Sequence, residues 1–583
     1  MSFEDVFNEF HAPRHIEARQ RPPQPEELSA AAATVERSLS DPNDITHIGT
    51  LTVDAISAYA AEVARATELA NTTAPVTIPG AGMAANAVGA EAAPKKKEGV
   101  LASSFWQLMS FMARFTGTFI ASILIGRFGD AEALGKFTVA LTISLITFTF
   151  VSFGIPNMLT RTLTRDLSKA PIWIEASVFL ALACGALWTA LFIPIWALFG
   201  GNHSTGTAAA LAIAASAFDA SGRLVFSAFW AFDRMRLESV ATWIQEVSFL
   251  VAAVVVLELH FGPNMVLVAF LVTRGIGAAV GWYFACKLTH RILIPRPHGK
   301  FLLPTLKGSF AFAVGDVGST LYIRQGSLVL EAVKGVGPVG LYSAGANIIF
   351  QLNIMARMIN NAIFPRMARC WPSRPAKLCA LRDAAMRAQG VVSVPLMIGG
   401  FLVAGQLLAA MYGPKYTPAT HCMMIMSLVI PVRMLSHTIG TTMTAINHQT
   451  ERSSTTIWAV LVNLGANIAL IPRFSYDGAA YATLITELFL FGVNAVQLRA
   501  WLGSSALGEA VIIPAFAAIP MALSLLATPH WPFLARIVLA GLTYVPAIIG
   551  VFLYQRSRKT GTPISFGKKS LKASVTGYLR AAS

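Results

Sequence analysis

Long apolar stretches separated by short polar ones dominate the chain from Leu101 onward. Each stretch has about 19–30 residues, and a helix needs roughly 17–25 to cross the hydrocarbon of a bilayer. The fourteen apolar segments are residues 101–125, 133–155, 171–199, 206–231, 239–258, 264–288, 308–333, 339–363, 387–411, 418–447, 454–472, 478–500, 507–528 and 532–554. This pattern predicts an all-α polytopic membrane protein with about 14 transmembrane helices and short connections.

The composition agrees with this pattern. Of the 583 residues, 55% are hydrophobic and only 13% are charged, whereas soluble domains carry about 25% charged residues. The chain is therefore expected to contact membrane lipids and no nucleic acid. The five cysteines form no pair or His-spaced set typical of a metal site, so no metal and no bound cofactor are predicted. The 36 phenylalanines are interpreted as ordinary lipid-facing or interfacial side chains.

Charge divides the chain into parts. Residues 1–94 hold 13 acidic and 5 basic side chains, while the rest carries a net charge of +23. A polar, Pro- and Ala-rich acidic segment of this kind is typical of disorder. The predicted parts are a disordered acidic cytoplasmic tail (1–98), an N-terminal six-helix lobe (99–290), a C-terminal six-helix lobe (300–501), an additional helix pair (505–555) and a basic cytoplasmic tail (556–583).

Basic residues also predict the orientation. Of the Lys and Arg residues in loops and flanks from Lys95 onward, 28 fall on the side of the termini and six on the other. Those six are Arg127, Lys136, Lys334, Lys415, Arg473 and Arg536. Because cytoplasmic loops are enriched in Lys and Arg, both termini are predicted to be cytoplasmic.

Two stretches suggest an internal repeat. Residues 128–165 follow the first apolar segment, and residues 335–369 follow the seventh. Each has a Gly-rich turn, an apolar helix and a basic loop. Repeated halves are typical of transporters whose site lies between them, so the two lobes are expected to surround a central cavity.

Ionisable residues inside the apolar segments are the candidate site. Away from the ends of the segments, the six arginines are Arg114, Arg223, Arg274, Arg324, Arg357 and Arg433; no lysine joins them there, and the acids are Asp219, Glu246, Asp316 and Glu487. An arginine at the membrane centre costs about 2.5–3.5 kcal/mol. These side chains must therefore face the interior of the bundle or a watered cavity.

The arginines are not equally informative. Arg114, Arg324 and Arg433 lie near the middle of their segments, and Arg274 lies somewhat toward the outer half. Arg223 and Arg357 lie closer to the cytoplasmic end and can extend to the headgroups. Asp219 is four residues from Arg223 on one helix face, where the two charges can neutralise each other.

Arginine is suited to bidentate contact with phosphate and keeps its charge. The six arginines therefore predict a cavity for an anionic passenger, with a pyrophosphate or anionic glycan as ligand. The four acids either bind a coupling ion or balance the arginines, and both interpretations stay open. The histidines of the tenth segment, His421 and His437, are interpreted as polar contacts rather than proton relays.

Several motifs resemble one family. The stretches GPVGLYSAGANIIF, FPRMAR, YGPKYTPA and NLGANIALIPRFSYDGAAYAT are similar to those of the polysaccharide flippases, which handle O-antigen or exopolysaccharide units within the multidrug/oligosaccharidyl-lipid/polysaccharide exporter superfamily. The resemblance covers about residues 100–500 and extends to the final pair of segments.

The resemblance implies a multi-pass transporter of the bacterial inner membrane, not an enzyme. Such a flippase moves undecaprenyl-pyrophosphate-linked oligosaccharides from the cytoplasmic to the periplasmic leaflet by alternating access, for lipopolysaccharide or exopolysaccharide synthesis. It implies membrane lipids and the lipid-linked oligosaccharide as partners, with a polymerase or export machinery as a further one. Antiport driven by a proton or Na⁺ gradient is left open.

Two alternatives are considered. A cation-coupled multidrug exporter would share the fold, but its cationic cargo calls for an acidic cavity, whereas six arginines face four acids here. A membrane glycan polymerase or ligase would need a large outer loop or clustered acids. The longest outer loops here have only about ten residues, which disfavours the enzyme.

Overall fold

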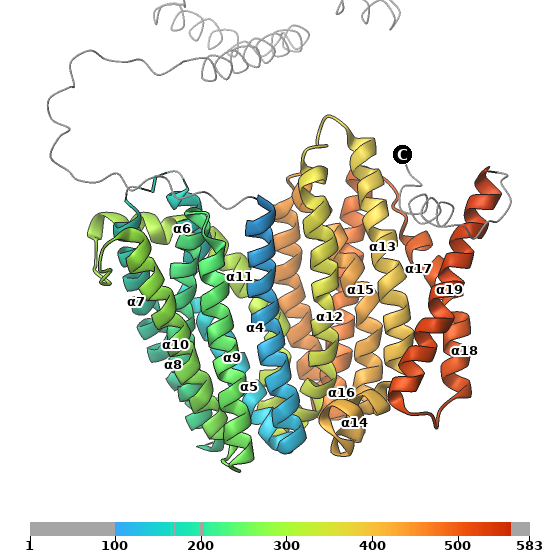
Figure 1. Cartoon of the computed structure of the whole chain (residues 1–583), viewed down its shortest axis with the longest axis horizontal. Helices are drawn as coiled ribbons and strands as arrows, with labels where there is room; N and C mark the ends of the chain where they lie inside the picture. The colour runs from blue at the N-terminus through green and yellow to red at the C-terminus, as the bar shows by residue number, and fades with distance from the viewer. Residues whose placement is uncertain (1–99, 165, 168, 199–202, 561–583) are drawn as a thin grey trace, which may run out of the picture. The chain divides into compact units, whose positions relative to one another are not determined.

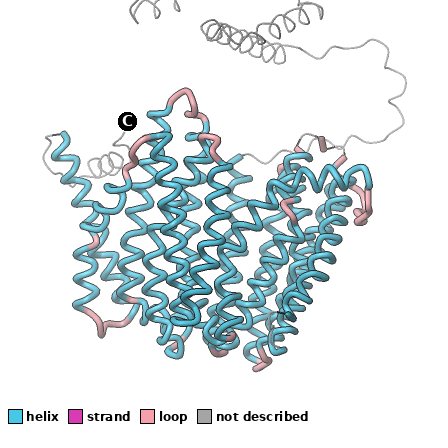
Figure 2. The backbone as a smooth tube through the Cα atoms, turned by 180° about the vertical axis from the view of Figure 1, so that it is seen from behind, coloured by secondary structure: helices cyan, strands magenta, loops and turns pink. Residues whose placement is uncertain are grey.

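The structure is a computed structural model that describes residues 100–560 except 165, 168 and 199–202. Within these residues the chain is helical and contains no strand (Figure 2). The predicted tail 1–98 lies outside the described residues, as does the basic tail from residue 561 onward. The last helix runs to Thr560, five residues beyond the predicted helix pair.

We call α4–α10 the N-lobe, α11–α16 the C-lobe and α17–α19 the C-terminal helices (Figure 1). The N-lobe consists of α4 (Val100–Phe128), α5 (Ala131–Ser152), α6 (Ile155–Leu163), α7 (Ala170–Leu198), α8 (His203–Ala231), α9 (Met235–Glu258) and α10 (Pro263–Thr289). The C-lobe consists of α11 (Gly299–Lys334), α12 (Val336–Ala368), α13 (Pro375–Leu402), α14 (Ala404–Tyr412), η1 (Pro414–Ala419), α15 (Thr420–Ala445) and α16 (Gln449–Leu502). The C-terminal helices are α17 (Leu507–Ala517), α18 (Ile519–Ala527) and α19 (Phe533–Thr560).

The fourteen predicted segments fall largely within these helices. Among the described residues, 12 helical stretches are long and apolar enough to cross a membrane. One of them, α16, has 54 residues and breaks at Ser475, whose φ of 52° is not helical. An unbroken helix of this length would extend about 80 Å, far beyond a bilayer, so its two arms correspond to two predicted segments. The seventh predicted segment lies in α11, which is not among these 12 stretches.

The helices stand side by side, and their connections lie at two ends. The beginning of α4, the α12–α13 connection and the end of α19 lie at one end (Figure 1), which we call the inner end. The α4–α5 turn and α14 lie at the opposite, outer end. Both ends of the helical part are therefore on one side, as the even number of predicted segments requires.

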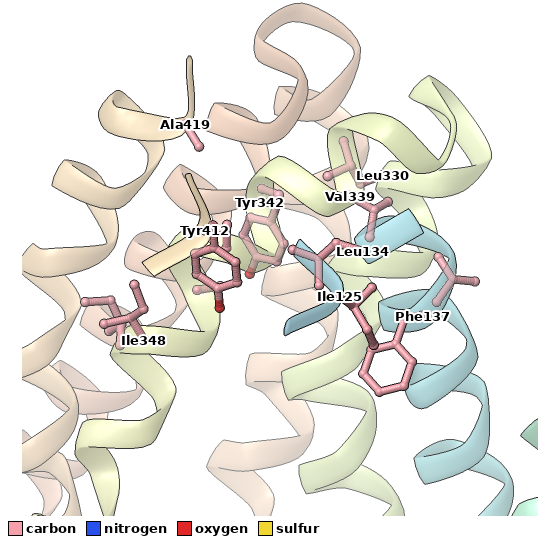
Figure 3. Packing of buried hydrophobic residues seen from close by; sticks show 14 of the residues in the cluster. Ile125, Leu134, Phe137, Leu330, Val339, Tyr342, Ile348, Tyr412 and Ala419 are labelled. Carbon is pink, nitrogen blue, oxygen red and sulfur yellow. The ribbon is translucent and has the colours of Figure 1, made fainter. Parts of the chain in front are cut away.

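Apolar side chains from both lobes form one core near the outer end (Figure 3). Leu134 of α5, Leu330 of α11 and Val339 of α12 are fully buried there. The ring of Tyr412, at the end of α14, is also fully buried. Burying this much apolar surface stabilises the contact between the lobes, so the outer end is sealed.

The two stretches compared as a repeat meet in this core. A Cβ added to Gly135 of α5 would lie 1.9 Å from the carbonyl oxygen of Val336. A Cβ added to Gly340 of α12 would lie 1.8 Å from the carbonyl oxygen of Ala131. The two contacts are reciprocal, as expected when equivalent surfaces pair about a local two-fold axis. Glycine is required at both positions because the backbones touch.

Residues of α14 and of the YGPKYTPA motif form hydrogen bonds with the α4–α5 turn. Arg127 donates a hydrogen bond to the carbonyl oxygen of Ala410 over 2.8 Å. Lys415 donates to the carbonyl oxygens of Arg127, at 3.2 Å, and of Gly129. The hydroxyl of Tyr416 donates to the carbonyl oxygen of Asp130 over 3.0 Å. These hydrogen bonds reinforce the apolar contact between the lobes at the outer end.

Candidate functional site

A cavity of about 300 Å³ lies between the two lobes. Residues of α4, α5, α8, α9 and α10 line it from the N-lobe, and residues of α11 and α12 line it from the C-lobe. Its charged lining residues are Arg114, Arg223, Arg274, Arg324, Asp219 and Glu246. Four of the six arginines singled out in the sequence therefore meet in one cavity, although they come from four different helices.

Two of these arginines alternate with carboxylates in the N-lobe. Arg274 is 4% exposed and lies 2.7 Å from Glu246 and 3.8 Å from Asp219. Asp219 also lies 2.9 Å from Arg223, one helical turn away. Asp219 and Arg223 therefore form the ion pair that their spacing in the sequence suggests. The four side chains form a continuous chain of two positive and two negative groups.

Arg114 also has a carboxylate partner, which the sequence prediction missed. Its guanidinium donates to Glu238 and lies 3.4 Å from the hydroxyl of Thr242. Glu238 is 2% exposed and falls in the first turn of α9, just before the predicted segment 239–258. Its spacing was a usable signal, because Glu238, Thr242 and Glu246 recur every four residues and share one helix face.

In the C-lobe, Arg433 is paired with Glu487. Their closest atoms are 3.1 Å apart, and both side chains are largely buried. The hydroxyl of Tyr322 on α11 donates to the same carboxylate. One turn away, the Gln325 amide donates to the Asn463 side-chain oxygen over 2.9 Å. This network joins α11 to both arms of α16.

Arg324 differs from the other arginines that line the cavity. No carboxylate of the described residues lies within 4 Å of its guanidinium, although the side chain lines the cavity. Arg357 of α12 also has no described carboxylate within 4 Å of its guanidinium, and its side chain is exposed. Asp316 is exposed as well, forms no ion pair within the described part of the chain and does not line the cavity.

The charges of the two lobes therefore differ. Of the six arginines singled out in the sequence, the three in the N-lobe face three carboxylates. The three in the C-lobe have only Glu487 as an ion-pair partner among the described residues. The sequence count of six arginines against four acids suggested a positive cavity. The structure assigns the excess positive charge to the C-lobe, with Arg324 inside the cavity.

A phenylalanine ring lies close to the guanidinium group of five of the six arginines. The distances from the guanidinium carbon to the ring centre are 4.4 Å for Arg274 and Phe270, 4.5 Å for Arg223 and Phe148, 4.8 Å for Arg433 and Phe350, 5.7 Å for Arg114 and Phe226, and 5.8 Å for Arg357 and Phe111. A cation over an aromatic face is stabilised by the ring quadrupole. The interpretation of the phenylalanines as lipid-facing is wrong for Phe111, Phe148, Phe270 and Phe350, which line the cavity.

The remaining polar candidates lie apart. His421 pairs with Asp477 over 2.9 Å and is exposed. His437 is partly buried on α15 and does not line the cavity. Within residues 100–560, apart from the gaps, no group of three or more His, Cys, Asp or Glu side chains could hold a metal ion.

Removing Arg274 should destabilise the fold, because it would leave Glu246 as an uncompensated buried charge. We expect Arg274→Met to lower the free energy of unfolding by about 3–5 kcal/mol. Adding Glu246→Gln should recover part of this loss, since one stranded charge is removed. Thermal unfolding in detergent measures both variants, with Arg374→Met, at an exposed position, as the control. Equal midpoints for Arg274→Met and Arg374→Met would contradict the prediction.

Comparison with known proteins supports the resemblance found in the sequence. Residues 100–371 match the family described as polysaccharide biosynthesis protein. The match covers a little under half of the chain and is a similarity of this region to that family. The match agrees with the motifs from GPVGLYSAGANIIF to FPRMAR, and the resemblance to polysaccharide flippases of the exporter superfamily is confirmed.

Relatives and a solved structure extend the similarity. The chain is 20% identical to the capsular polysaccharide biosynthesis protein CapF of Staphylococcus aureus, over 63% of this chain and 91% of the relative. It is 21% identical to Agl15 of Haloferax volcanii, described as a probable low-salt glycan biosynthesis flippase, over 33% of this chain and 40% of the relative. The structure of the lipid II flippase MurJ in an inward closed conformation superposes with a TM-score of 0.65 at 14% identity, over 78% of this chain and 99% of that chain. The fold is therefore that of this class of multi-pass membrane transporters.

Proposed function

We propose that this protein is a transporter, not an enzyme, that moves an undecaprenyl-pyrophosphate-linked oligosaccharide from the cytoplasmic to the periplasmic leaflet. The observation that supports it best is the cavity between the lobes, where Arg324 adds a positive charge that no described carboxylate balances. An anionic headgroup would be stabilised there, because arginine donates paired hydrogen bonds to phosphate oxygens.

The sealed outer end fits the starting point of such a cycle. With the inner end facing the cytoplasm, as the distribution of basic residues predicts, the headgroup enters from the cytoplasmic leaflet. The polyprenyl tail stays in the lipid while the pyrophosphate contacts the arginines. The lobes then separate at the reciprocal Gly135–Gly340 contact and close at the inner end. The glycan is released to the outer leaflet of the inner membrane, where a polymerase or export machinery takes it up for surface polysaccharide synthesis.

The electrostatics support an anionic cargo over a cationic drug. A cationic drug would need an unpaired carboxylate in the cavity. The carboxylates that line it, Asp219 and Glu246, are both held by arginines. Their pairing also supports a charge-balancing role for them. Whether a proton or Na⁺ gradient drives the cycle is tested by collapsing each gradient separately in the assay below.

The purified full chain in liposomes tests the proposal. A polyprenyl-pyrophosphate oligosaccharide is placed in the membrane, and its exposure on each leaflet is measured with an impermeant glycan-cleaving enzyme. We expect the protein to move the lipid between leaflets well above the rate in protein-free liposomes, and to leave a cationic dye where it is. Dye movement without movement of the pyrophosphate lipid would refute the proposed cargo.

A further inference from the structure

A second cavity, of about 320 Å³, lies at the inner end of the C-lobe. It shares no lining residue with the cavity between the lobes. Its walls are Arg382 of α13, one residue of α15 and the chain from the end of α16 to the start of α17. The lining residues include Arg382, Arg499, Ser504 and Ser505, and no acidic side chain.

Arg382 is the buried charge of this pocket. It is 1% exposed, one of the largest fully buried side chains of the described residues. Its Nε donates to Asp383 over 2.9 Å, and its Nη2 donates to the carbonyl oxygen of Ser504 over 2.7 Å. Nη1 has no hydrogen-bond partner among the described residues. A buried cationic N–H without an acceptor costs at least about 1–3 kcal/mol, so Nη1 can still donate a hydrogen bond to an oxygen of a ligand.

Arg499 supplies the excess charge. It lies in the last turn of α16, is exposed and forms no ion pair with a described carboxylate. The neighbouring charges are already matched, because Asp383 faces Arg382 and Glu509 lies 2.9 Å from Arg387. The pocket therefore carries about one uncompensated positive charge, together with two serine side chains that can donate hydrogen bonds.

The surroundings indicate where the ligand comes from. Val496 lines the pocket and is 70% exposed, on the outer surface of an apolar helix. Such a wall suits an acyl chain, and basic pockets between helices at the cytoplasmic side of a membrane bind anionic lipid headgroups. A free anion in water would gain nothing from this apolar wall.

We propose that this pocket binds the headgroup phosphate of an anionic phospholipid, with Arg499 and Arg382 as its ligands and an acyl chain along Val496. The lipid would fill the joint between the C-lobe and α17, the first of the C-terminal helices. The proposal is independent of the cargo of the central cavity.

Native mass spectrometry of the full chain in detergent tests the site, with phosphatidylglycerol, phosphatidylcholine and inorganic phosphate as separate probes. We expect phosphatidylglycerol to bind preferentially and Arg499→Gln to weaken it by about tenfold, because one charge-assisted contact is lost. Arg374→Gln removes an exposed charge from the same end outside the pocket and should leave binding unchanged.

Three results of this experiment would overturn the proposed lipid site. Equal weakening by Arg499→Gln and Arg374→Gln would show a diffuse charge effect and overturn the site. Equal binding of phosphatidylcholine would overturn the requirement for a net anionic lipid. Displacement of phosphatidylglycerol by millimolar inorganic phosphate would show that a free anion occupies the pocket and would overturn the lipid. Arg382→Gln should give a larger loss than Arg499→Gln, and its unfolding midpoint checks that the variant is folded.

Discussion

Replacing Arg324 by alanine is expected to lower transport of a pyrophosphate-linked oligosaccharide by about 10- to 100-fold. Arg324 lines the cavity without a carboxylate partner among the described residues, so its charge is available to the passenger. A hydrogen bond to a charged group is worth about 1.5–3 kcal/mol, and every 1.4 kcal/mol is about tenfold in affinity. The liposome assay described above measures the loss at low substrate concentration.

Two further variants test whether the charge, the planar guanidinium group or the lack of a partner makes Arg324 important. Arg324→Lys keeps the charge but lacks the planar fork, so an intermediate rate is expected. Arg223→Ala removes an arginine from the same cavity that is already paired with Asp219, and a smaller loss is expected because its charge is balanced. If Arg324→Ala is folded and transports at the parent rate, Arg324 does not bind the passenger.

Replacing Gly340 by valine is expected to open the outer end and to stop the transport cycle. The added Cβ would lie 1.8 Å from the carbonyl oxygen of Ala131, far inside van der Waals contact. Neither backbone can yield without separating α5 from α12, so the sealed state becomes inaccessible. A cysteine introduced at Ser144, which lines the cavity, should then react faster with an impermeant maleimide added from the outer side.

Gly337→Val is the matched control. Gly337 lies on the same helix, three residues away, and a Cβ there would meet nothing within 4 Å. The outer seal should therefore form as in the parent, and labelling should stay slow. The five native cysteines are replaced beforehand in all variants. Equal labelling of the Gly340→Val and Gly337→Val variants would mean that the α5–α12 contact does not gate the cavity.

The membrane helices follow from local information. Apolar length alone locates every helix long enough to cross a bilayer, because the hydrocarbon permits few other structures. The break in α16 was also readable, since the polar stretch around Arg473 separates two apolar runs. The residue composition of those helices pointed to the arginines as well, because a charge at that depth needs an explanation.

Which charges pair depends on contacts between segments that are far apart in the sequence. A single sequence does not contain these contacts. Arg114 and Arg433 looked unpaired in the sequence, yet each meets a carboxylate from another helix. Glu238 precedes the predicted segment 239–258, because the apolar pattern begins four residues after the start of α9. A shift of one helical turn thus hid the partner of Arg114.

The sequence by itself determined that this is a helical membrane protein with arginines buried among its helices, because hydropathy and charge act locally. Only the tertiary structure decided which of the arginines lining the cavity has no carboxylate partner among the described residues. That property depends on which helices face one another across the cavity between the lobes. It leaves Arg324 as the cavity arginine most available to an anionic passenger.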